Sequence, residues 1–401
     1  MPPQPYLRAA HAIWRLLPPR LRRHAFTAAA AAIARKPDRT PPGASNGVVI
    51  AGDTASPNGL AESARILHSV LSANGLARGF VPLGLPPDVP ASRAPAPADA
   101  ALLAVVNAPI LPASLLRLPR GFIAGRRVIG FWAWELPCVP KTWEHGAKFV
   151  HEIWAPSPFT AGALERLAPG RVRVVPLPLA AADLCMSGTR AGFGLPEDRI
   201  IVLTVINLAS SMVRKNPLGA IAAFKAAFGE SRGHLFVLKL SGTEDYPKDV
   251  AQIREAIGKA KNIRLIAATF PDAQLRGLIA ACDIILSLHR AEGFGLILAT
   301  AMLLNRPVIA TGWSGNIAYM KKGCAALIAY LLVPATDPRG SYQMPHARWA
   351  EPDIEDAAAR LRELSESPAK RMAMAQAGQA YAREMLGTAP LLAALAANGI
   401  R

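Results

Sequence analysis

Short apolar runs that alternate with potential helices are the feature that most constrains the fold of this sequence. The second half carries five such runs, at 200–205, 235–240, 263–266, 284–286 and 308–310, each followed by a potential helix. The first half shows a similar series, at 47–51, 101–106, 127–137, 152–157 and 171–178. This alternation predicts mostly parallel sheets covered by helices. A turn-rich stretch at 179–198 separates the two series, so we expect two α/β domains that face a cleft.

Charge and cysteine content restrict the partners and the compartment. The formal net charge is +17, from 45 Lys and Arg against 28 Asp and Glu. A chain with this positive charge can bind nucleic acid, an anionic membrane or acidic small molecules. We find no nucleic-acid-binding signature and expect no nucleic acid partner. The four cysteines are far apart, which suits a reducing cytoplasm, and no residues show metal-ligand spacing. No apolar run reaches about 18 residues, so we expect no transmembrane helix.

The first 45 residues differ from the rest of the chain. They carry eight Lys and Arg residues against Asp38 alone, a net charge of 8 − 1 = +7. Apolar residues such as Trp14, Leu17 and Phe26 lie between the charges, and the Ala28–Ala32 run favours a helix. A basic helix of this kind can lie on an anionic membrane surface. The alternatives are a helix that packs on the body of the protein and a poorly ordered tail.

A charged, glycine-bearing turn follows the apolar run at 284–286. It brings Glu292, Gly293 and Gly295 to the start of an apolar helix that ends near Asn305. In α/β folds, ligands bind at the carboxyl ends of the strands. Glycines let the backbone approach a ligand, and the free N–H groups of a helix N-terminus favour anionic or polyhydroxyl groups. An ordinary strand-to-helix turn is the alternative.

This turn resembles the sugar-nucleotide site of retaining GT-B glycosyltransferases of family 4. The family pattern is E-G-F-G-L-x-x-x-E-A-M, and this chain reads E-G-F-G-L-I-L-A-T-A-M from Glu292 to Met302. The resemblance implies that Glu292 contacts the donor sugar. At the position of Thr300 the family has a second glutamate, which holds the ribose hydroxyls. A threonine makes one hydrogen bond there and lacks the bidentate contact of a carboxylate. We therefore expect a weakened ribose contact.

Further donor-binding residues follow from the same resemblance. Lys215 matches the lysine that grips the donor diphosphate, with Arg214 beside it and Lys239 at the end of the next strand. A solvated surface pair is the alternative for these cations. The glycine-bearing loop Thr311–Asn316 resembles the family's loop beside the donor, where a plain turn is the alternative. The remaining donor-binding candidates are His289, Gly293, Phe294, Gly295, Leu296, Ser314, Gly315 and Asn316. His289 could equally be a structural cap.

Two segments of the first half resemble the cleft face of the same enzymes. Gly59 and Glu62 belong to a G-x-x-E-x-A-R pattern, for which plain helix capping is the alternative. Trp134 and Glu135 belong to a W-A-W-E-L-P segment typical of a subset of the family. Aromatic faces beside a carboxylate hold sugars by stacking and hydrogen bonds, although tryptophans are commonly core residues. We expect these four residues on the acceptor side of the cleft.

The resemblance covers about residues 47 to 385 and implies a GT-B fold, with two Rossmann-like domains whose parallel sheets face a cleft. The expected divisions are a basic extension at 1–45, an acceptor domain at 46–180, a nucleotide-sugar-binding domain at 195–385 and a tail at 386–401. The implied activity is retaining transfer of a sugar from a nucleotide diphosphate sugar to a glycan or lipid-linked acceptor. Glu292 and Lys215 are the catalytic candidates, and no metal is expected.

We expect a hexosyltransferase-like enzyme of bacterial surface polysaccharide synthesis, cytoplasmic and peripheral on the inner membrane. Thr300 motivates a different hypothesis, a non-catalytic GT-B protein that binds or scaffolds an active enzyme. A GT-B sugar-nucleotide epimerase is a third, which the Glu135 segment and the basic N-terminus disfavour.

Overall fold

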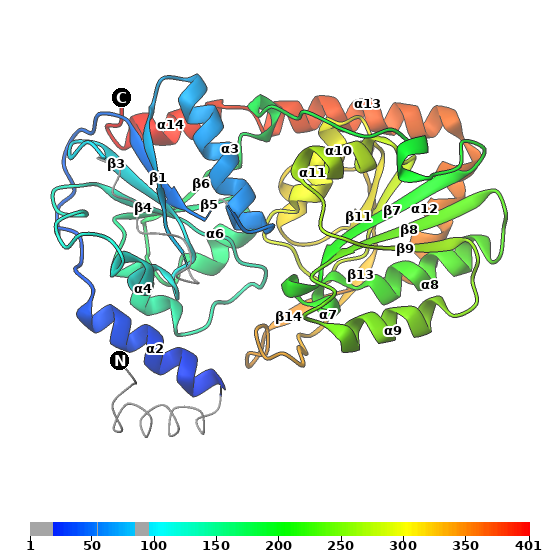
Figure 1. Ribbon diagram of the computed structural model, residues 1–401, viewed down its shortest axis with the longest axis horizontal. Helices are drawn as coiled ribbons and strands as arrows, with labels where there is room; N and C mark the ends of the chain where they lie inside the picture. The colour runs from blue at the N-terminus through cyan, green and yellow to red at the C-terminus, as the bar shows by residue number, and fades with distance from the viewer. Residues whose placement is uncertain (1–18, 54, 85–95) are drawn as a thin grey trace, which may run out of the picture.

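The computed structural model describes residues 19–53, 55–84 and 96–401. Two α/β domains lie side by side in it, as Figure 1 shows. The two-domain prediction is therefore confirmed. The first 18 residues of the basic extension and most of the proline-rich segment, 85–95, lie outside the described residues.

The N-terminal domain is built on a six-stranded parallel sheet in the order β2-β1-β3-β4-β5-β6. Its strands are β1 (Val48–Gly52), β2 (Ala77–Pro82), β3 (Ala101–Val105), β4 (Val128–Phe131), β5 (Glu152–Ala155) and β6 (Val172–Val174). Its helices include α3 (Gly59–Ala73), α4 (Leu111–Leu115), α5 (Trp143–Ala147) and α6 (Pro158–Leu164). Strands β1, β3 and β4 are buried throughout, as expected for apolar runs in a sheet covered on both faces.

The C-terminal domain has a second parallel sheet in the order β12-β11-β10-β7-β8-β9. Its strands are β7 (Ile200–Asn207), β8 (His234–Ser241), β9 (Ile263–Ala267), β10 (Ile284–Ser287), β11 (Val308–Thr311) and β12 (Ala326–Ile328). Its helices are α7 (Met212–Lys215), α8 (Pro217–Phe228), α9 (Pro247–Ile257), α10 (Asp272–Ala280), α11 (Leu296–Leu303), α12 (Ile354–Glu366) and α13 (Pro368–Met385). An antiparallel hairpin of β13 (Tyr330–Pro334) and β14 (Arg348–Pro352) follows β12.

The strand orders determine where ligands can bind. In the C-terminal sheet the chain order reverses between β7 and β10, which pair directly. In the N-terminal sheet it reverses between β1 and β3. Ligands of open α/β sheets bind outside the carboxyl ends of the strands at such reversals. The turns after β7 and β10 carry Lys215 and Glu292, so the fold brings these distant residues together.

The last residues of the chain return to the N-terminal domain. Helix α14 (Ala389–Ala397) buries Leu391 and Leu395, and the N–H of Gly47 donates to the carbonyl of Arg401 at 2.8 Å. Figure 1 shows α14 against the N-terminal sheet, beyond the end of α13. The expected tail at 386–401 is thus a packed helix, because its Leu and Ala residues cover apolar strands. The chain passes between the two domains twice, near Ala180 and near Leu386. These two places are adjacent, since the N–H of Ala180 donates to Leu386 O at 3.0 Å.

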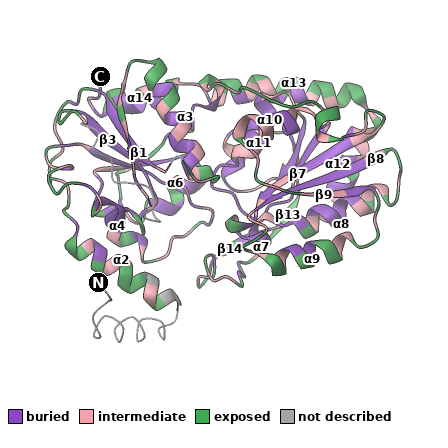
Figure 2. Cartoon of the chain, in the orientation of Figure 1, coloured by how far each residue is buried: buried purple, intermediate pink, exposed green. Residues whose placement is uncertain are grey.

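Helix α2 (Pro19–Ile33) packs against α4 and α5 at the edge of the N-terminal domain. Thr27 and Ala30 are buried there, whereas Leu21, Phe26 and Ile33 are exposed, Ile33 to 73%. Figure 2 shows the largely exposed outer face of this helix. For residues 19–33, the alternative of a helix packed on the body therefore holds, and its outer face remains free for another contact. None of the helices in the described residues is long and apolar enough to cross a membrane.

Candidate functional site

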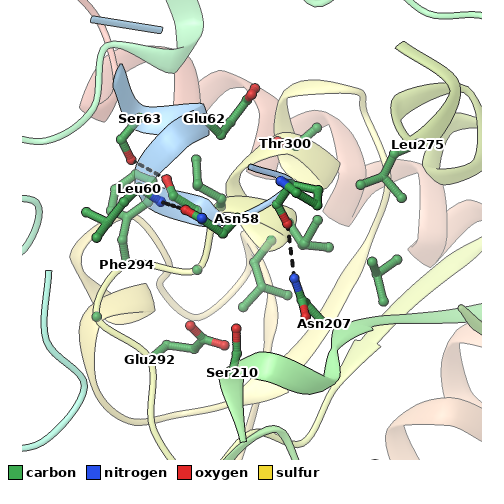
Figure 3. Close-up of a pocket in the computed structure, with 18 of the residues that line it drawn as sticks. Asn58, Leu60, Glu62, Ser63, Asn207, Ser210, Leu275, Glu292, Phe294 and Thr300 are labelled. Atoms are coloured by element: carbon green, nitrogen blue, oxygen red, sulfur yellow. Dashed lines mark hydrogen bonds between the residues drawn. The ribbon is translucent and has the colours of Figure 1, made fainter. Parts of the chain in front are cut away.

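A cavity of about 460 Å³ lies between the two domains, at the carboxyl ends of both sheets. The candidates that line it are Gly59, Glu62, Glu135, Arg214, Lys215, Lys239, Glu292, Gly293, Phe294, Gly295, Leu296 and Thr300. Figure 3 shows this pocket, with Glu292 and Ser210 along its lower side and Glu62, Ser63 and Thr300 along its upper side. The fold thus gathers most of the predicted residues around one space.

Glu292 lies in the turn between β10 and α11 and is almost fully buried. Its carboxylate accepts a hydrogen bond from Lys215 Nζ and lies 3.5 Å from Arg214 Nη1. Burial alone would raise the pKa of Glu292, but the charges of Lys215 and Arg214 outweigh it and lower the pKa to about 2. The carboxylate therefore stays ionised and acts as a hydrogen-bond acceptor at any physiological pH.

Arg214 connects this turn to the N-terminal domain. Its Nη1 donates to Ala291 O at 2.7 Å, and its Nη2 lies 3.7 Å from Glu135 Oε1. Burial disfavours its charge, yet the surrounding Tyr342, Glu135 and Glu292 raise the pKa of Arg214 above its ordinary value. The guanidinium is consequently a fixed positive charge between two carboxylates, one from each domain.

The two lysines of the cavity differ in their partners. Lys215 is paired with Glu292, and burial together with Arg214 lowers the pKa of Lys215 despite that pair. Lys239 is also buried, and burial lowers the pKa of Lys239 to about 8. Among the described residues its Nζ has an aromatic contact, 5.4 Å from the Phe270 ring centroid, and no ion pair. An anion that enters the cavity would supply the missing counter-charge.

Several predicted donor-binding residues lie behind the Glu292 turn and do not line the cavity. Ser314 Oγ accepts from the N–H of Glu292 at 2.8 Å, and Gly315 N–H donates to Glu292 O at 2.8 Å. His289 Nε2 is 3.0 Å from Asn316 Oδ1, and both side chains are fully buried. These four residues support the turn from behind, because the loop after β11 packs beneath it, and their direct contact with a donor stays a prediction.

Trp134 likewise packs beside the cavity without lining it. Its Nε1 donates to Cys138 O at 2.7 Å, and its ring stacks on Tyr342 with centroids 5.4 Å apart. Glu135, the next residue, does line the cavity. In this structure Trp134 stacks on Tyr342, its contact with a sugar stays a prediction, and Glu135 is the residue of this segment that lines the cavity.

Tyr342 is a site residue that the sequence did not reveal. Its hydroxyl donates to Glu135 Oε2 at 3.1 Å, and the Arg214 guanidinium lies 5.3 Å from its ring centroid. It belongs to an irregular segment between β13 and β14, shaped by Asp337, whose carboxylate accepts from the N–H of Tyr342 at 3.0 Å. No apolar period or motif marks this segment, so only the three-dimensional structure connects it with Glu135.

The opposite wall of the cavity carries charges from both domains. Glu62 and Arg65 of α3 form an ion pair at 2.7 Å, and Arg65 also reaches Asp272 of α10 at 3.0 Å. Arg276 lies 3.7 Å from Glu62. Burial raises the pKa of Glu62, and Asp272 raises it further. These four side chains close the cavity between α3 and α10, so Glu62 is both a lining residue and part of the domain contact.

Chemically, the cavity presents fixed cations beside one ionised acceptor. No group of three or more His, Cys, Asp and Glu side chains arranged to hold a metal occurs in residues 19–53, 55–84 and 96–401. Thr300 lines the cavity from α11 with its hydroxyl as the polar group. Such a site can bind an anion at Arg214, Lys215 and Lys239 and hydroxyl groups at Glu292.

We predict that Glu292→Gln destabilises the protein, since it leaves Arg214 and Lys215 without their buried counter-charge. The folded-state pKa of Glu292 lies near 2, below its ordinary value of 4.5, which corresponds to roughly 3 kcal/mol at neutral pH. This stability is present above pH 4.5 and is lost as the pH falls through about 2. In urea unfolding, the free energy of unfolding of Glu292→Gln should be lower than that of the unmodified protein at pH 7, and this difference should become smaller toward pH 3.

The matched control is Glu363→Gln, because Glu363 forms exposed ion pairs with Arg360 and Lys370. Exposed pairs contribute at most about 1 kcal/mol. If the difference in free energy of unfolding between Glu292→Gln and the unmodified protein stayed constant from pH 7 to pH 3, the buried-charge explanation would be contradicted.

Comparisons with known proteins agree with this geometry. Residues 200–343 match the model of the family described as glycosyl transferases group 1. A search of the curated proteins found no match. Among solved structures, the chain is similar to Alr3699/HepE of Anabaena in complex with UDP and glucose. The TM-score is 0.61 at 15% identity, over 88% of this chain and 98% of that one.

Two further structures share the architecture. Sucrose-phosphate synthase from Thermosynechococcus elongatus has a TM-score of 0.61 at 14% identity, over 90% of this chain and 98% of that one. WaaG, a glycosyltransferase involved in lipopolysaccharide biosynthesis, has a TM-score of 0.56 at 18% identity, over 87% of this chain and 99% of that one. At these identities the likeness establishes the GT-B fold, and the family match covers the domain that carries Lys215 and Glu292. Residues 200–343 of this chain are therefore similar to the glycosyl transferases group 1 family, and the chain as a whole has the GT-B fold.

Proposed function

We propose that this protein transfers a sugar from a nucleoside diphosphate sugar to a glycan or lipid-linked acceptor, with retention of the anomeric configuration. The observation that carries the proposal is the buried Lys215–Glu292 pair, with Arg214 beside it and Lys239 unpaired among the described residues, at the carboxyl ends of β7 and β10. A diphosphate needs cations and a sugar needs hydrogen-bond acceptors, and this cavity offers both.

In the proposed donor complex, the diphosphate takes the place of Glu292 at Lys215 and gains Lys239. Glu292, released from Lys215 but still near Arg214, accepts hydrogen bonds from the sugar hydroxyls. The cations stabilise the negative charge that grows on the diphosphate as the bond to the anomeric carbon breaks. Thr300 makes a single hydrogen bond to a ribose hydroxyl.

The acceptor enters from the N-terminal side of the cavity, which Asn107, Ala133, Glu135 and Pro156 line. The acceptor oxygen forms the new bond to the anomeric carbon on the face from which the diphosphate departs, and its proton passes to a departing diphosphate oxygen. Glu135 orients the acceptor hydroxyls, and Gly59 and Glu62 border the same space. Closure of the two domains around the bound donor would exclude water, which would otherwise hydrolyse the donor.

The structural relatives support this choice of substrates. The Anabaena protein was solved with UDP-glucose and with UDP and glucose, and WaaG takes part in lipopolysaccharide biosynthesis. We accordingly propose a UDP-sugar as the first donor to test, and a role in bacterial surface polysaccharide synthesis of family 4 type. Sucrose-phosphate synthase shares the fold, so a small sugar acceptor belongs in the same assays.

A second candidate function rests on Thr300. Because this position has no carboxylate, the protein could bind a nucleotide sugar weakly and act as a non-catalytic partner of an active GT-B enzyme. Transfer assays and titrations with the unmodified protein separate the two functions, since a non-catalytic partner neither transfers sugar nor hydrolyses the donor.

Lys239 gives the nucleotide site a characteristic pH dependence. The pKa of Lys239 near 8 rises when a diphosphate binds, so binding takes up a proton and weakens as the pH increases. We expect the affinity for UDP to fall between pH 7 and pH 9 in calorimetric titrations. Lys239→Met should bind UDP at least about tenfold more weakly at pH 7, the equivalent of one charge-assisted hydrogen bond, with a flatter pH profile. The exposed Lys259→Met is the control, and an unchanged affinity in Lys239→Met would remove this lysine from the site.

Thr300 can be tested with a matched pair of substitutions. Thr300→Glu should tighten UDP binding about tenfold or more, because a carboxylate accepts from both ribose hydroxyls and such charged hydrogen bonds contribute roughly 1.5–3 kcal/mol. Thr300→Gln has the same shape without the charge and should gain less. Equal or weaker binding by Thr300→Glu would show that the pocket holds its ligand differently, which favours the non-catalytic function.

We further propose that the protein works at the cytoplasmic face of the inner membrane, bound there through residues 1–40. The described part of this segment presents exposed Leu21, Phe26 and Ile33, and exposed Arg35, Lys36 and Arg39 follow along the chain. Apolar and cationic groups together suit the interface of an anionic bilayer. The separated cysteines, found unpaired, suit a reducing compartment.

The triple variant Arg35→Gln/Lys36→Gln/Arg39→Gln should bind phosphatidylserine-containing vesicles more weakly, at roughly 1 kcal/mol per basic residue. Vesicle co-sedimentation at fixed ionic strength measures the change. The control replaces Lys321, Lys322 and Arg383 with glutamine, since these exposed cations lie near α13, away from α2 in Figure 1. Similar losses in both triple variants would indicate only general charge attraction and would contradict a dedicated surface.

A further inference from the structure

The backbone of Glu292 and Gly293 is held by both domains. On the C-terminal side, Ser314 and Gly315 bond the N–H and the carbonyl of Glu292, each at 2.8 Å. On the N-terminal side, Ser157 Oγ donates to Gly293 O at 2.6 Å. The turn that carries the candidate catalytic carboxylate is therefore shared between the two domains.

Thr160 completes the N-terminal contact. Its Oγ1 lies 3.1 Å from Gly293 O and 2.9 Å from Trp134 O, so its single proton can be donated to either carbonyl. Ser157 and Thr160 are fully buried at the start of α6, where Ser157 also caps the helix. We call Ser157, Thr160 and the Gly293 carbonyl the interdomain clamp.

The backbones on either side of the clamp approach closely. A Cβ atom added to Gly293 would lie 2.9 Å from Trp134 O, and one added to Gly315 would lie 2.0 Å from Gly293 O. Glycine is thus required at both positions by the neighbouring backbone. Phe159, in α6, makes an edge-to-face contact with Trp313, with ring centroids 5.0 Å apart. The start of α6 therefore packs against both the loop after β10 and the loop after β11.

We infer that Ser157 and Thr160 are positioning residues that give the Glu292 turn its working geometry only when the two domains are closed. The Gly293 carbonyl is buried by the N-terminal domain, and a buried carbonyl without a donor is costly. Separation of the domains removes its donors and the packing against Trp134 together. The Glu292 turn then loses its anchor one residue away and keeps only the contacts within the C-terminal domain, so its carboxylate is held less firmly beside Lys215. Closure of the cleft and assembly of the donor site are one event.

The catalytic part of this inference rests on the proposed function, but the clamp itself can be tested without substrate. Thr160→Val keeps the shape of the side chain and removes the hydroxyl, whereas Thr160→Ser keeps the hydroxyl and removes the methyl group. Amide hydrogen exchange of a peptide covering 288–296 should accelerate about tenfold or more in Thr160→Val. In Thr160→Ser it should stay close to that of the unmodified protein.

With UDP-glucose, or whichever donor the unmodified protein turns over, kcat should fall in Thr160→Val by a larger factor than KM rises, since the turn still binds but no longer holds Glu292. Thr160→Ser should restore kcat. Gly293→Ala disturbs the clamp from the C-terminal domain, because the added methyl group collides with the Trp134 backbone. It should accelerate amide exchange at 288–296 in the same way, so the test remains decisive if Thr160→Val folds poorly.

The outcomes separate the clamp from the proposed function. Equal exchange in the Val and Ser variants, or an unaffected turn in Gly293→Ala, would overturn the clamp even if sugar transfer is found. Accelerated exchange in Thr160→Val and Gly293→Ala, but not in Thr160→Ser, would establish the clamp even if the unmodified protein transfers no sugar, and the proposed function would then fail by itself.

Discussion

The burial of one carboxylate between two cations is the constraint on which the site depends. Glu292 cannot be ionised inside the protein without Lys215 and Arg214, and these come from the turn after β7 while Glu292 comes from the turn after β10. The pair therefore fixes two loops of the C-terminal sheet against each other, and Arg214 extends the arrangement to Glu135 of the other domain. It also means that Lys215 already has a protein counter-charge, so that the proposed diphosphate has to replace a carboxylate there.

The charge of the whole cavity fits such an exchange. The lining cations are Arg65, Arg214, Lys215, Lys239 and Arg276, and the lining carboxylates are Glu62, Glu135, Asp272 and Glu292. One positive charge is left over, and Lys239 is the cation without an ion pair among the described residues. A glutamate in place of Thr300 would cancel this excess. In the proposed donor complex, the threonine gives up part of the ribose contact, and it leaves the cavity one positive charge with which to attract a phosphate group.

The sequence predicted the parts of the fold and site that local pattern or motif specifies. The ten apolar runs correspond to strands, and the central ones are continuously apolar because parallel strands are buried on both faces. Strand β2 was missed, since Arg78 and Gly79 interrupt an edge strand that is only partly buried, and the β13–β14 hairpin was missed with Tyr342. The motif placed Glu292 near Lys215, but no motif indicates that the two bond directly. The motif also placed Ser314, Asn316 and His289 beside this turn, but not the bonds by which they support it, because a motif gives proximity and not the direction in which a side chain points.

The paired crossings of the chain have a mechanical consequence. Ala180 and Leu386 are bonded to each other where the two covalent connections pass between domains, and Figure 1 shows this junction at one edge of the molecule, beside α13 and α14. Two adjacent connections act as a hinge, about which the domains can rotate with little freedom to slide. Displacement grows with distance from such an axis. The segment between β13 and β14 lies toward the opposite edge. The hydrogen bond from Tyr342 to Glu135 would therefore break early in any opening, and the cleft would widen first on that side.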